Sequence, residues 1–201
     1  MTLTIDKLST LISSEFVKHN IILEETKDVY KYGVEISISS IVGFTITLII
    51  GLIFNALIQA IIFYVIFISL RSITGGYHAE TYLKCNLIFG LVTLFVVIFS
   101  KVSCEMQMPG GVLTLLFLPS VTTFIWLAPV ENINKPIEKK KRVYWKITAV
   151  VTSVLLYILS TLLYINQHTL ESTVIIMTIF MVSVLCMIAV IKKGGKANEK
   201  F

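Results

Sequence analysis

Residues 36–70, ISISSIVGFTITLIIGLIFNALIQAIIFYVIFISL, contain no Asp, Glu, Lys or Arg. A membrane-spanning helix needs about 20 apolar residues to cross about 30 Å of hydrocarbon at 1.5 Å per residue. The stretch is therefore too long for a single span, and we expect two spans with a turn at Asn55. A buried helix of a soluble protein rarely needs an apolar run of this length.

Three further runs, 106–130, 147–170 and 172–191, also lack Asp, Glu, Lys and Arg. Over the whole chain 56% of residues are hydrophobic and 14% are charged, whereas soluble proteins carry about 25% charged residues. We therefore expect an all-α, polytopic membrane bundle of about six helices. The expected spans lie near residues 36–54, 57–74, 85–101, 111–129, 147–165 and 171–191.

Turn-forming residues separate the later spans. Pro109-Gly110-Gly111 precedes the fourth span, Pro129 ends it, and Asn166-Gln167-His168 lies between the last two. Before the first span, apolar residues fall on one helical face and predict an amphipathic helix, either lying in the membrane interface or packing against the bundle. These residues are Ile5, Leu8, Leu11, Ile12 and Phe16.

Positive charges predict the orientation, because Lys and Arg remain on the cytoplasmic side of short loops. The three loops on one side hold only Lys101 among the 17 Lys and Arg residues. The others lie before the first span, in the second and fourth loops and in the tail, so we expect these segments and both termini in the cytoplasm. The run 138–142 (EKKKR) is a topology anchor that could also attract anionic lipid headgroups or an acidic peptide segment. A nucleic-acid partner is not needed to explain the basic composition.

The cysteines and histidines are few and widely spaced. Three cysteines, Cys85, Cys104 and Cys186, do not predict a disulfide framework. The three histidines are far apart, so we expect no metal site and no cofactor. We expect Cys104 and Cys186 to be packing residues.

The segment that carries chemistry is residues 71–85, RSITGGYHAETYLKC, between the second and third spans. It contains both His78 and Cys85. A cysteine thiol is mostly protonated at neutral pH, and a nearby imidazole can take its proton and stabilise the thiolate. Such a pair can attack a peptide carbonyl and later return the proton to the leaving amine. Without further observations, a small apolar filler at Cys85 and a solvated loop histidine at His78 remain open.

Geometry restricts how these two side chains could meet. On one straight helix they would lie about 10.5 Å apart along the axis, too far for a hydrogen bond. Gly75-Gly76 supplies backbone freedom just before His78. We therefore expect a loop that folds His78 back toward Cys85 at the start of the third span. One unbroken helix through both residues would contradict the pair.

Several motifs together resemble the AgrB family, the accessory gene regulator B peptidases of Gram-positive quorum sensing. The resemblance extends over nearly the whole chain in length, number of spans and order of motifs. It is carried by Arg71, Gly75-Gly76-Tyr77-His78-Ala79 and Cys85, by Gly33-Val34-Glu35, and by Ala128-Pro129 followed by Asn134-Lys135-Pro136-Ile137.

The resemblance implies a cysteine endopeptidase that removes the C-terminal part of an AgrD-like propeptide and holds the remainder as a thioester. A cysteine or serine of the propeptide then closes a thiolactone or lactone ring. Cys85 would be the nucleophile and His78 the general base and acid. Arg71 would bind a carboxylate or phosphate group or anchor the loop, unless it is only a topology charge. Glu35, where other members have Gln, would orient His78 or serve as a structural cap.

These expectations divide the chain into an amphipathic cytoplasmic segment (1–33), a six-helix transmembrane peptidase domain (34–191) with its catalytic loop at 71–85, and a basic cytoplasmic tail (192–201). Membrane lipids and the propeptide are the expected partners. Gly43 and Gly51 on one expected helix are a hint of a homodimer. The competing functions are a small peptide transporter or exporter and a non-enzymatic membrane scaffold.

Overall fold

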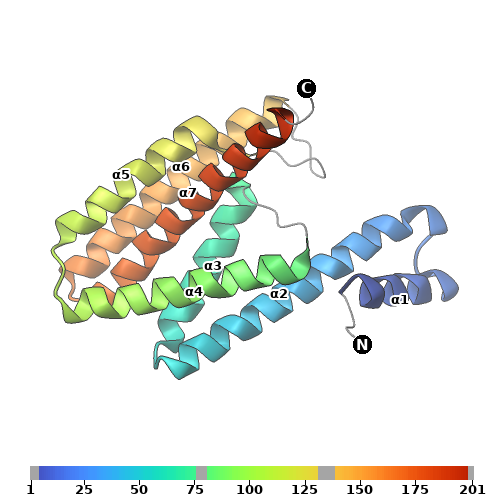
Figure 1. The fold of residues 1–201 in the computed structure, drawn as a ribbon, viewed down its shortest axis with the longest axis horizontal. Helices are drawn as coiled ribbons and strands as arrows, with labels where there is room; N and C mark the ends of the chain where they lie inside the picture. Colours follow the sequence, from blue (N-terminus) through green and yellow to red (C-terminus); the bar gives the residue numbers. More distant parts are fainter. Residues whose placement is uncertain (1–4, 76–80, 131–138, 199–201) are drawn as a thin grey trace. The chain divides into compact units, whose positions relative to one another are not determined.

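The computed structural model describes residues 5–75, 81–130 and 139–198, with side chains for all of these except 139–140 and 193–198 (Figure 1). The described residues form seven α-helices and one short 3-10 helix, Glu24–Thr26. The α-helices are α1 (Ile5–Lys18), α2 (Lys27–Ile53), α3 (Leu57–Thr74), α4 (Tyr82–Glu105), α5 (Gly110–Leu127), α6 (Lys139–Ile165) and α7 (Thr169–Asn198).

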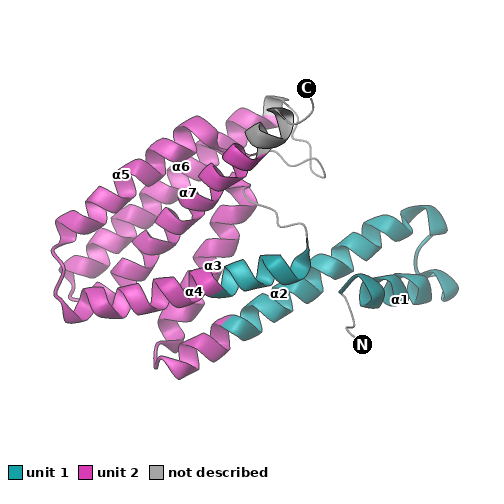
Figure 2. Ribbon diagram, viewed as in Figure 1, with its two compact units in different colours: residues 1–46, 79–90 teal, residues 47–78, 91–201 magenta. Residues whose placement is uncertain are grey.

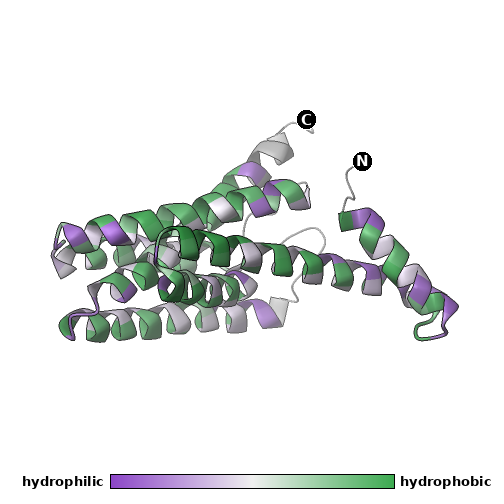
Figure 3. Cartoon of the chain, turned by 90° about the horizontal axis from the view of Figure 1, so that it is seen from below, coloured by the Kyte–Doolittle hydropathy of each residue, from purple (hydrophilic) through white to green (hydrophobic). Residues whose placement is uncertain are grey.

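Six of these helices, α2 to α7, are long and apolar enough to cross a membrane, which confirms the predicted all-α bundle of six spans. Figure 3 shows hydrophobic residues along these helices and hydrophilic residues toward their ends and on α1. Helix α2 begins at Lys27, before the predicted start of the first span, and α7 runs on to Asn198. Charged residues can continue a helix beyond the hydrocarbon, because their long side chains reach the water interface.

The predicted turn residues also separate the helices. Asn55, with a positive φ of 49°, lies between α2 and α3. Pro109 precedes α5, and α5 ends at Leu127, two residues before Pro129. Gln167, with a φ of 67°, lies between α6 and α7. These local signals therefore set the ends of the helices.

The chain divides into two compact units, coloured in Figure 2. Unit 1 comprises residues 1–46 and 79–90, so it contains α1, most of α2 and the first turns of α4. Unit 2 comprises residues 47–78 and 91–201, with the remainder of α2 and α4 and helices α3, α5, α6 and α7.

Helix α7 forms the centre of unit 2, where it contacts α3, α5 and α6. In its apolar window 56% of the residues are buried, against at most 33% in any other span. A helix that is apolar on all sides is typical of such a central position. The buried hydroxyls of Ser160 and Ser172 lie 2.8 Å apart between α6 and α7, a contact common between membrane helices.

The outward surfaces of the spans are apolar. Large side chains such as Leu52, Leu115 and Trp126 are more than 60% exposed. Apolar surface of this extent marks contact with a membrane or a partner. Together with the lengths of the six helices, it fits a bundle surrounded by lipid.

Helix α1 is the predicted amphipathic helix. Its buried residues, Ser9 and Ser13, lie one turn apart on the same face, and the hydroxyl of Ser9 contacts Glu35 of α2. Leu8 and Leu11 remain exposed, Leu11 by 60%. Helix α1 therefore packs on α2 through small side chains and leaves apolar ones outward, as expected at a membrane surface.

The two glycines that hinted at a homodimer have neighbours within the chain. A Cβ on Gly43 would lie 3.5 Å from the ring of Phe89 in unit 1. A Cβ on Gly51 would lie 3.0 Å from both Ala60 and Leu57 in unit 2. Both glycines thus permit close packing inside one chain, and the homodimer stays a prediction.

Candidate active site

Cys85, the predicted nucleophile, lies in the first turn of α4. This turn is capped by Thr81, whose carbonyl accepts the Cys85 N–H (3.0 Å) and whose hydroxyl accepts the Lys84 N–H (3.3 Å). A threonine in this position satisfies one of the N–H groups that a helix start leaves unpaired. The cap explains why α4 begins here. Cys85 itself is half-buried, and its thiol is free.

The segment before Cys85 is not one continuous helix. Helix α3 ends at Thr74 and α4 begins at Tyr82. The structure therefore meets the condition under which His78 could reach Cys85. His78 and Gly76 themselves lie outside the described residues, so the pair stays a prediction.

Gly75 ends α3 in a conformation that requires glycine. Its φ is +68°, and a Cβ at this position would lie 2.3 Å from the carbonyl oxygen of Val130. The N–H of Val130 donates to the carbonyl of Thr74 (2.9 Å), which makes a single parallel bridge between the two segments. The backbone freedom predicted for Gly75 is confirmed, and its cause is the close approach of the chain that follows Ala128-Pro129.

Arg71 lies in the last turn of α3 with its side chain half-buried. Its guanidinium carbon is 5.6 Å from the centre of the Phe67 ring, within the range of a cation–π contact. Below this end of α3, the fully buried Cys186 of α7 places its sulfur 4.0 Å from the Gly75 carbonyl oxygen. Cys186 is thus a packing residue, as expected. Binding of an acidic group by Arg71 stays a prediction.

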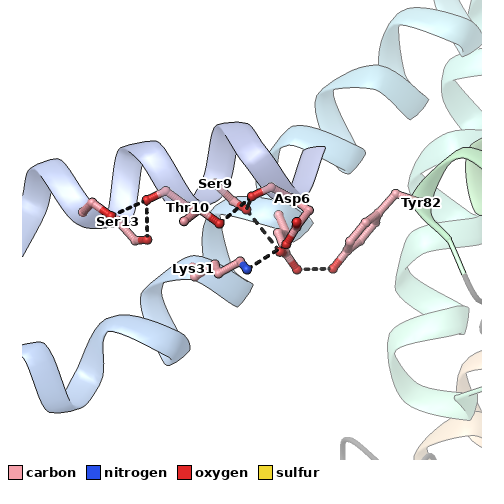
Figure 4. Close-up of polar contacts among 8 residues, drawn as sticks. Asp6, Ser9, Thr10, Ser13, Lys31 and Tyr82 are labelled. Atoms are coloured by element: carbon pink, nitrogen blue, oxygen red, sulfur yellow. Dashed lines mark hydrogen bonds and ion pairs between the residues drawn. The ribbon is translucent and has the colours of Figure 1, made fainter. Parts of the chain in front are cut away.

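Glu35 joins three helices of unit 1. Tyr82 at the start of α4 donates a hydrogen bond to Oε2 of Glu35 (2.7 Å), and Ser9 of α1 donates to Oε1 (3.1 Å) (Figure 4). One turn earlier on α2, the ammonium of Lys31 lies 2.7 Å from the Asp6 carboxylate. Glu35 therefore connects α1, α2 and α4, and its predicted role as a structural cap stays a prediction. Its predicted orientation of His78 is untested.

Beyond Glu35, two further contacts join α2 and α4. The hydroxyl of Ser39 donates to Oδ1 of Asn86 (3.0 Å), and one turn later Gly43 faces the ring of Phe89. We name these three contacts, Glu35–Tyr82, Ser39–Asn86 and Gly43–Phe89, the α2–α4 seam. Residues three and four apart share a helix face, so Cys85 lies on the seam side of α4. Tyr82, Cys85 and Asn86 on that side are half-buried and Phe89 is buried, whereas Leu83, Lys84 and Leu87 are exposed.

Among the described residues, no group of three His, Cys, Asp or Glu side chains is placed to hold a metal ion. The chemistry that the described residues can supply is that of the Cys85 thiol and the polar groups around it.

Comparison with known proteins adds to this geometry. The model of accessory gene regulator B, AgrB, matches residues 6–191.

The chain belongs to the AgrB family. Two AgrB-like proteins of Clostridium perfringens are similar to it along most of their length. AgrB-like protein 2 of strain 13 is 30% identical over 194 residues, which cover 91% of this chain and 90% of the relative. The AgrB-like protein of strain SM101 is 31% identical over 172 residues, covering 81% and 79%. Protein FsrB of Enterococcus faecalis is 30% identical over 108 residues, covering 54% and 44%. No solved structure matches significantly.

Membership of the AgrB family implies involvement in the processing of quorum-sensing autoinducer peptides. With its six apolar helices, this AgrB chain is a multi-pass membrane protein. Sequence reasoning missed the donors to Glu35 and the cap of the turn that carries Cys85. The 3-and-4 spacing of Tyr82, Cys85, Asn86 and Phe89 was a usable signal for a packed face, and Thr81 was a usable signal for a helix cap.

Proposed function

We propose that this protein is a membrane-embedded cysteine endopeptidase. It removes the C-terminal part of an AgrD-like propeptide and closes the remainder into a thiolactone or lactone ring. The observation that supports this most directly is the placement of Cys85. The thiol is half-buried in a capped first turn, directly after an interruption between α3 and α4 that contains His78.

The first half of the reaction cleaves the propeptide. His78 takes the proton of the Cys85 thiol, and the sulfur attacks the carbonyl carbon of the scissile peptide bond. The imidazolium then returns the proton to the leaving amine as the C–N bond breaks. The C-terminal fragment departs with a free amino group, and the N-terminal fragment remains as a thioester on Cys85.

The second half closes the ring. A cysteine thiol or serine hydroxyl of the bound fragment gives its proton to His78 and attacks the thioester carbonyl. The bond to Cys85 breaks, and the sulfur of Cys85 regains the proton. Water competes for the same thioester, so a site that excludes water favours the ring over hydrolysis. A membrane interface also holds an amphipathic propeptide close to the enzyme and raises its effective concentration.

The charge distribution supports a cytoplasmic site. The flanks of the α3–α4 loop, the segment before α6 together with the first turns of α6, and both ends of the chain carry nearly all Lys and Arg residues. In this orientation both termini and Cys85 face the cytoplasm, where a newly made propeptide would meet the enzyme. The basic residues near the start of α6, including Lys141 and Arg142, can contact anionic lipid headgroups.

The test uses a propeptide tagged at both ends and co-expressed with the full chain. Wild type is compared with Cys85→Ala and His78→Ala, and with Cys104→Ala as a control that removes a different half-buried thiol. We expect wild type and the control to remove the C-terminal tag, with products identified by mass spectrometry, and both site variants to leave it in place. Processing by Cys85→Ala would refute the peptidase and would turn attention to a transporter or a scaffold.

A further inference from the structure

The first turn of α4 must hold Cys85 accurately if its sulfur is to attack a carbonyl. A helix start is prone to fray, because its first N–H groups lack partners within the helix. Thr81 supplies one of these partners through its side chain. Tyr82, the next residue, supplies a second attachment, since its phenol is bonded to the Glu35 carboxylate on α2.

The Glu35–Tyr82 bond has the features of a strong contact. Its length is 2.7 Å, and both side chains are half-buried. A hydroxyl bonded to a carboxylate is a charge-assisted hydrogen bond, stronger than one between neutral groups. The carboxylate is itself held by Ser9 of α1, through its other oxygen. Tyr82 is therefore attached to a group that is fixed from a second direction.

The Glu35–Tyr82 bond lies close to Cys85 on α4. Tyr82 and Cys85 are three residues apart, so they lie on the same side of α4. On the far side of Cys85, Asn86 is bonded to Ser39. The turn that carries the thiol is thus bonded to α2 three residues before Cys85 and at the residue directly after it.

We infer that Tyr82 and Glu35 are positioning residues for the acyl transfer at Cys85, an inference that rests on the proposed peptidase function. Neither side chain takes part in bond making. They hold the Cys85 turn where the sulfur meets the scissile carbonyl. A displacement of about 1 Å at a reacting atom can slow a reaction by about a hundredfold. Packing does not depend on the phenol oxygen, because Ser39–Asn86 and Gly43–Phe89 remain in the seam without it.

The test measures steady-state removal of the tagged tail by the full chain reconstituted in lipid vesicles. Tyr82→Phe keeps the ring and loses the hydrogen bond, and Glu35→Ala removes its acceptor. Glu35→Gln keeps an oxygen that can accept from Tyr82. Tyr30→Phe is the matched control, since it removes a phenol oxygen from an exposed position on α2.

We expect Tyr82→Phe and Glu35→Ala each to lower kcat by about tenfold to about a hundredfold, with KM unchanged. The thermal midpoint should stay unchanged in Tyr82→Phe, whereas Glu35→Ala also removes the acceptor of Ser9. Glu35→Gln should restore most of kcat, Tyr30→Phe should match wild type, and the double variant Tyr82→Phe/Glu35→Ala should be no slower than either single variant. Wild-type kcat in Tyr82→Phe, a kcat loss in Tyr82→Phe that tracks a lower thermal midpoint, or independent losses in the double variant would each overturn the inference. Tail removal by Cys85→Ala would instead overturn the proposed function, so the two failures are distinguishable.

Discussion

The phenol of Tyr82 donates a 2.7 Å hydrogen bond to Oε2 of Glu35, and Tyr82 lies one helical turn before Cys85. The bond joins residues that are 47 positions apart in the chain. It connects the start of α4, which carries Cys85, to α2. Helix α2 is also bonded to α1, because Ser9 donates to Glu35. The turn that carries Cys85 is therefore attached to α2, which is itself bonded to α1.

Removing the cap of α4 should loosen the Cys85 turn. Thr81→Val loses the oxygen that accepts the Lys84 N–H, and loss of a helix cap costs about 0.5–2 kcal/mol. We expect faster hydrogen exchange at the amides of Lys84 and Cys85, together with slower propeptide processing. Thr81→Ser keeps the hydroxyl and should resemble wild type. Equal exchange in the valine and serine variants would show that Thr81 does not cap the helix.

Gly75 should be far less tolerant of a side chain than Gly111. Gly75→Ala places a methyl group 2.3 Å from the Val130 oxygen at a φ of 68° and a ψ of −150°, and such a backbone conformation alone costs about 1–3 kcal/mol. A Cβ on Gly111, in the first turn of α5, meets nothing within 4 Å. Thermal unfolding in detergent should show a clear loss for Gly75→Ala and no loss for Gly111→Ala. A similar midpoint for both variants would contradict the bridge between Gly75 and Val130.

The three cysteines should differ in their reactivity and in the side from which they react. Cys186 is fully buried, whereas Cys85 and Cys104 are half-buried. In variants with one cysteine each, a membrane-impermeant maleimide should label Cys85 only from the cytoplasmic side. Cys104 should react only from the other side, and Cys186 only after denaturation. Labelling of Cys85 in intact cells would refute the proposed orientation.

Gly51 should be required for the close approach of α2 and α3. A Cβ there would lie 3.0 Å from the Cα of Leu57 and from the Cβ of Ala60, so Gly51→Val overfills the contact at a typical cost of about 1–3 kcal/mol. Gly33→Ala on the same helix meets open space and serves as the control. We expect a lower thermal midpoint for Gly51→Val alone. A change of oligomeric state with an unchanged midpoint would instead assign Gly51 to a dimer interface.

The helices could be predicted from sequence because their signals are local. Runs without charge predict spans, and Asn55, Pro109 and Gln167 lie where the helices end. The amphipathic face of α1 was likewise visible in its periodicity. Each of these signals lies within a few residues of the feature that it predicts.

The partners of the site could not be predicted in the same way. Glu35 was a candidate only through its place in a motif, and nothing near it in the sequence indicates Tyr82 or Ser9 as its donors. Gly75 was expected to provide backbone freedom, but its approach to Val130 depends on how two distant segments meet. Such contacts result from packing between helices, which periodicity does not specify.

The most direct test of the central claim is to trap the acyl-enzyme. A propeptide whose ring-closing cysteine or serine is replaced by alanine can be cleaved but cannot cyclise. Intact-mass spectrometry of the full chain should then show an adduct with the mass of the N-terminal fragment. The adduct should be released by hydroxylamine and absent in Cys85→Ala. An adduct that persists in Cys85→Ala, or cleavage of the altered propeptide by Cys85→Ala, would contradict Cys85 as the nucleophile.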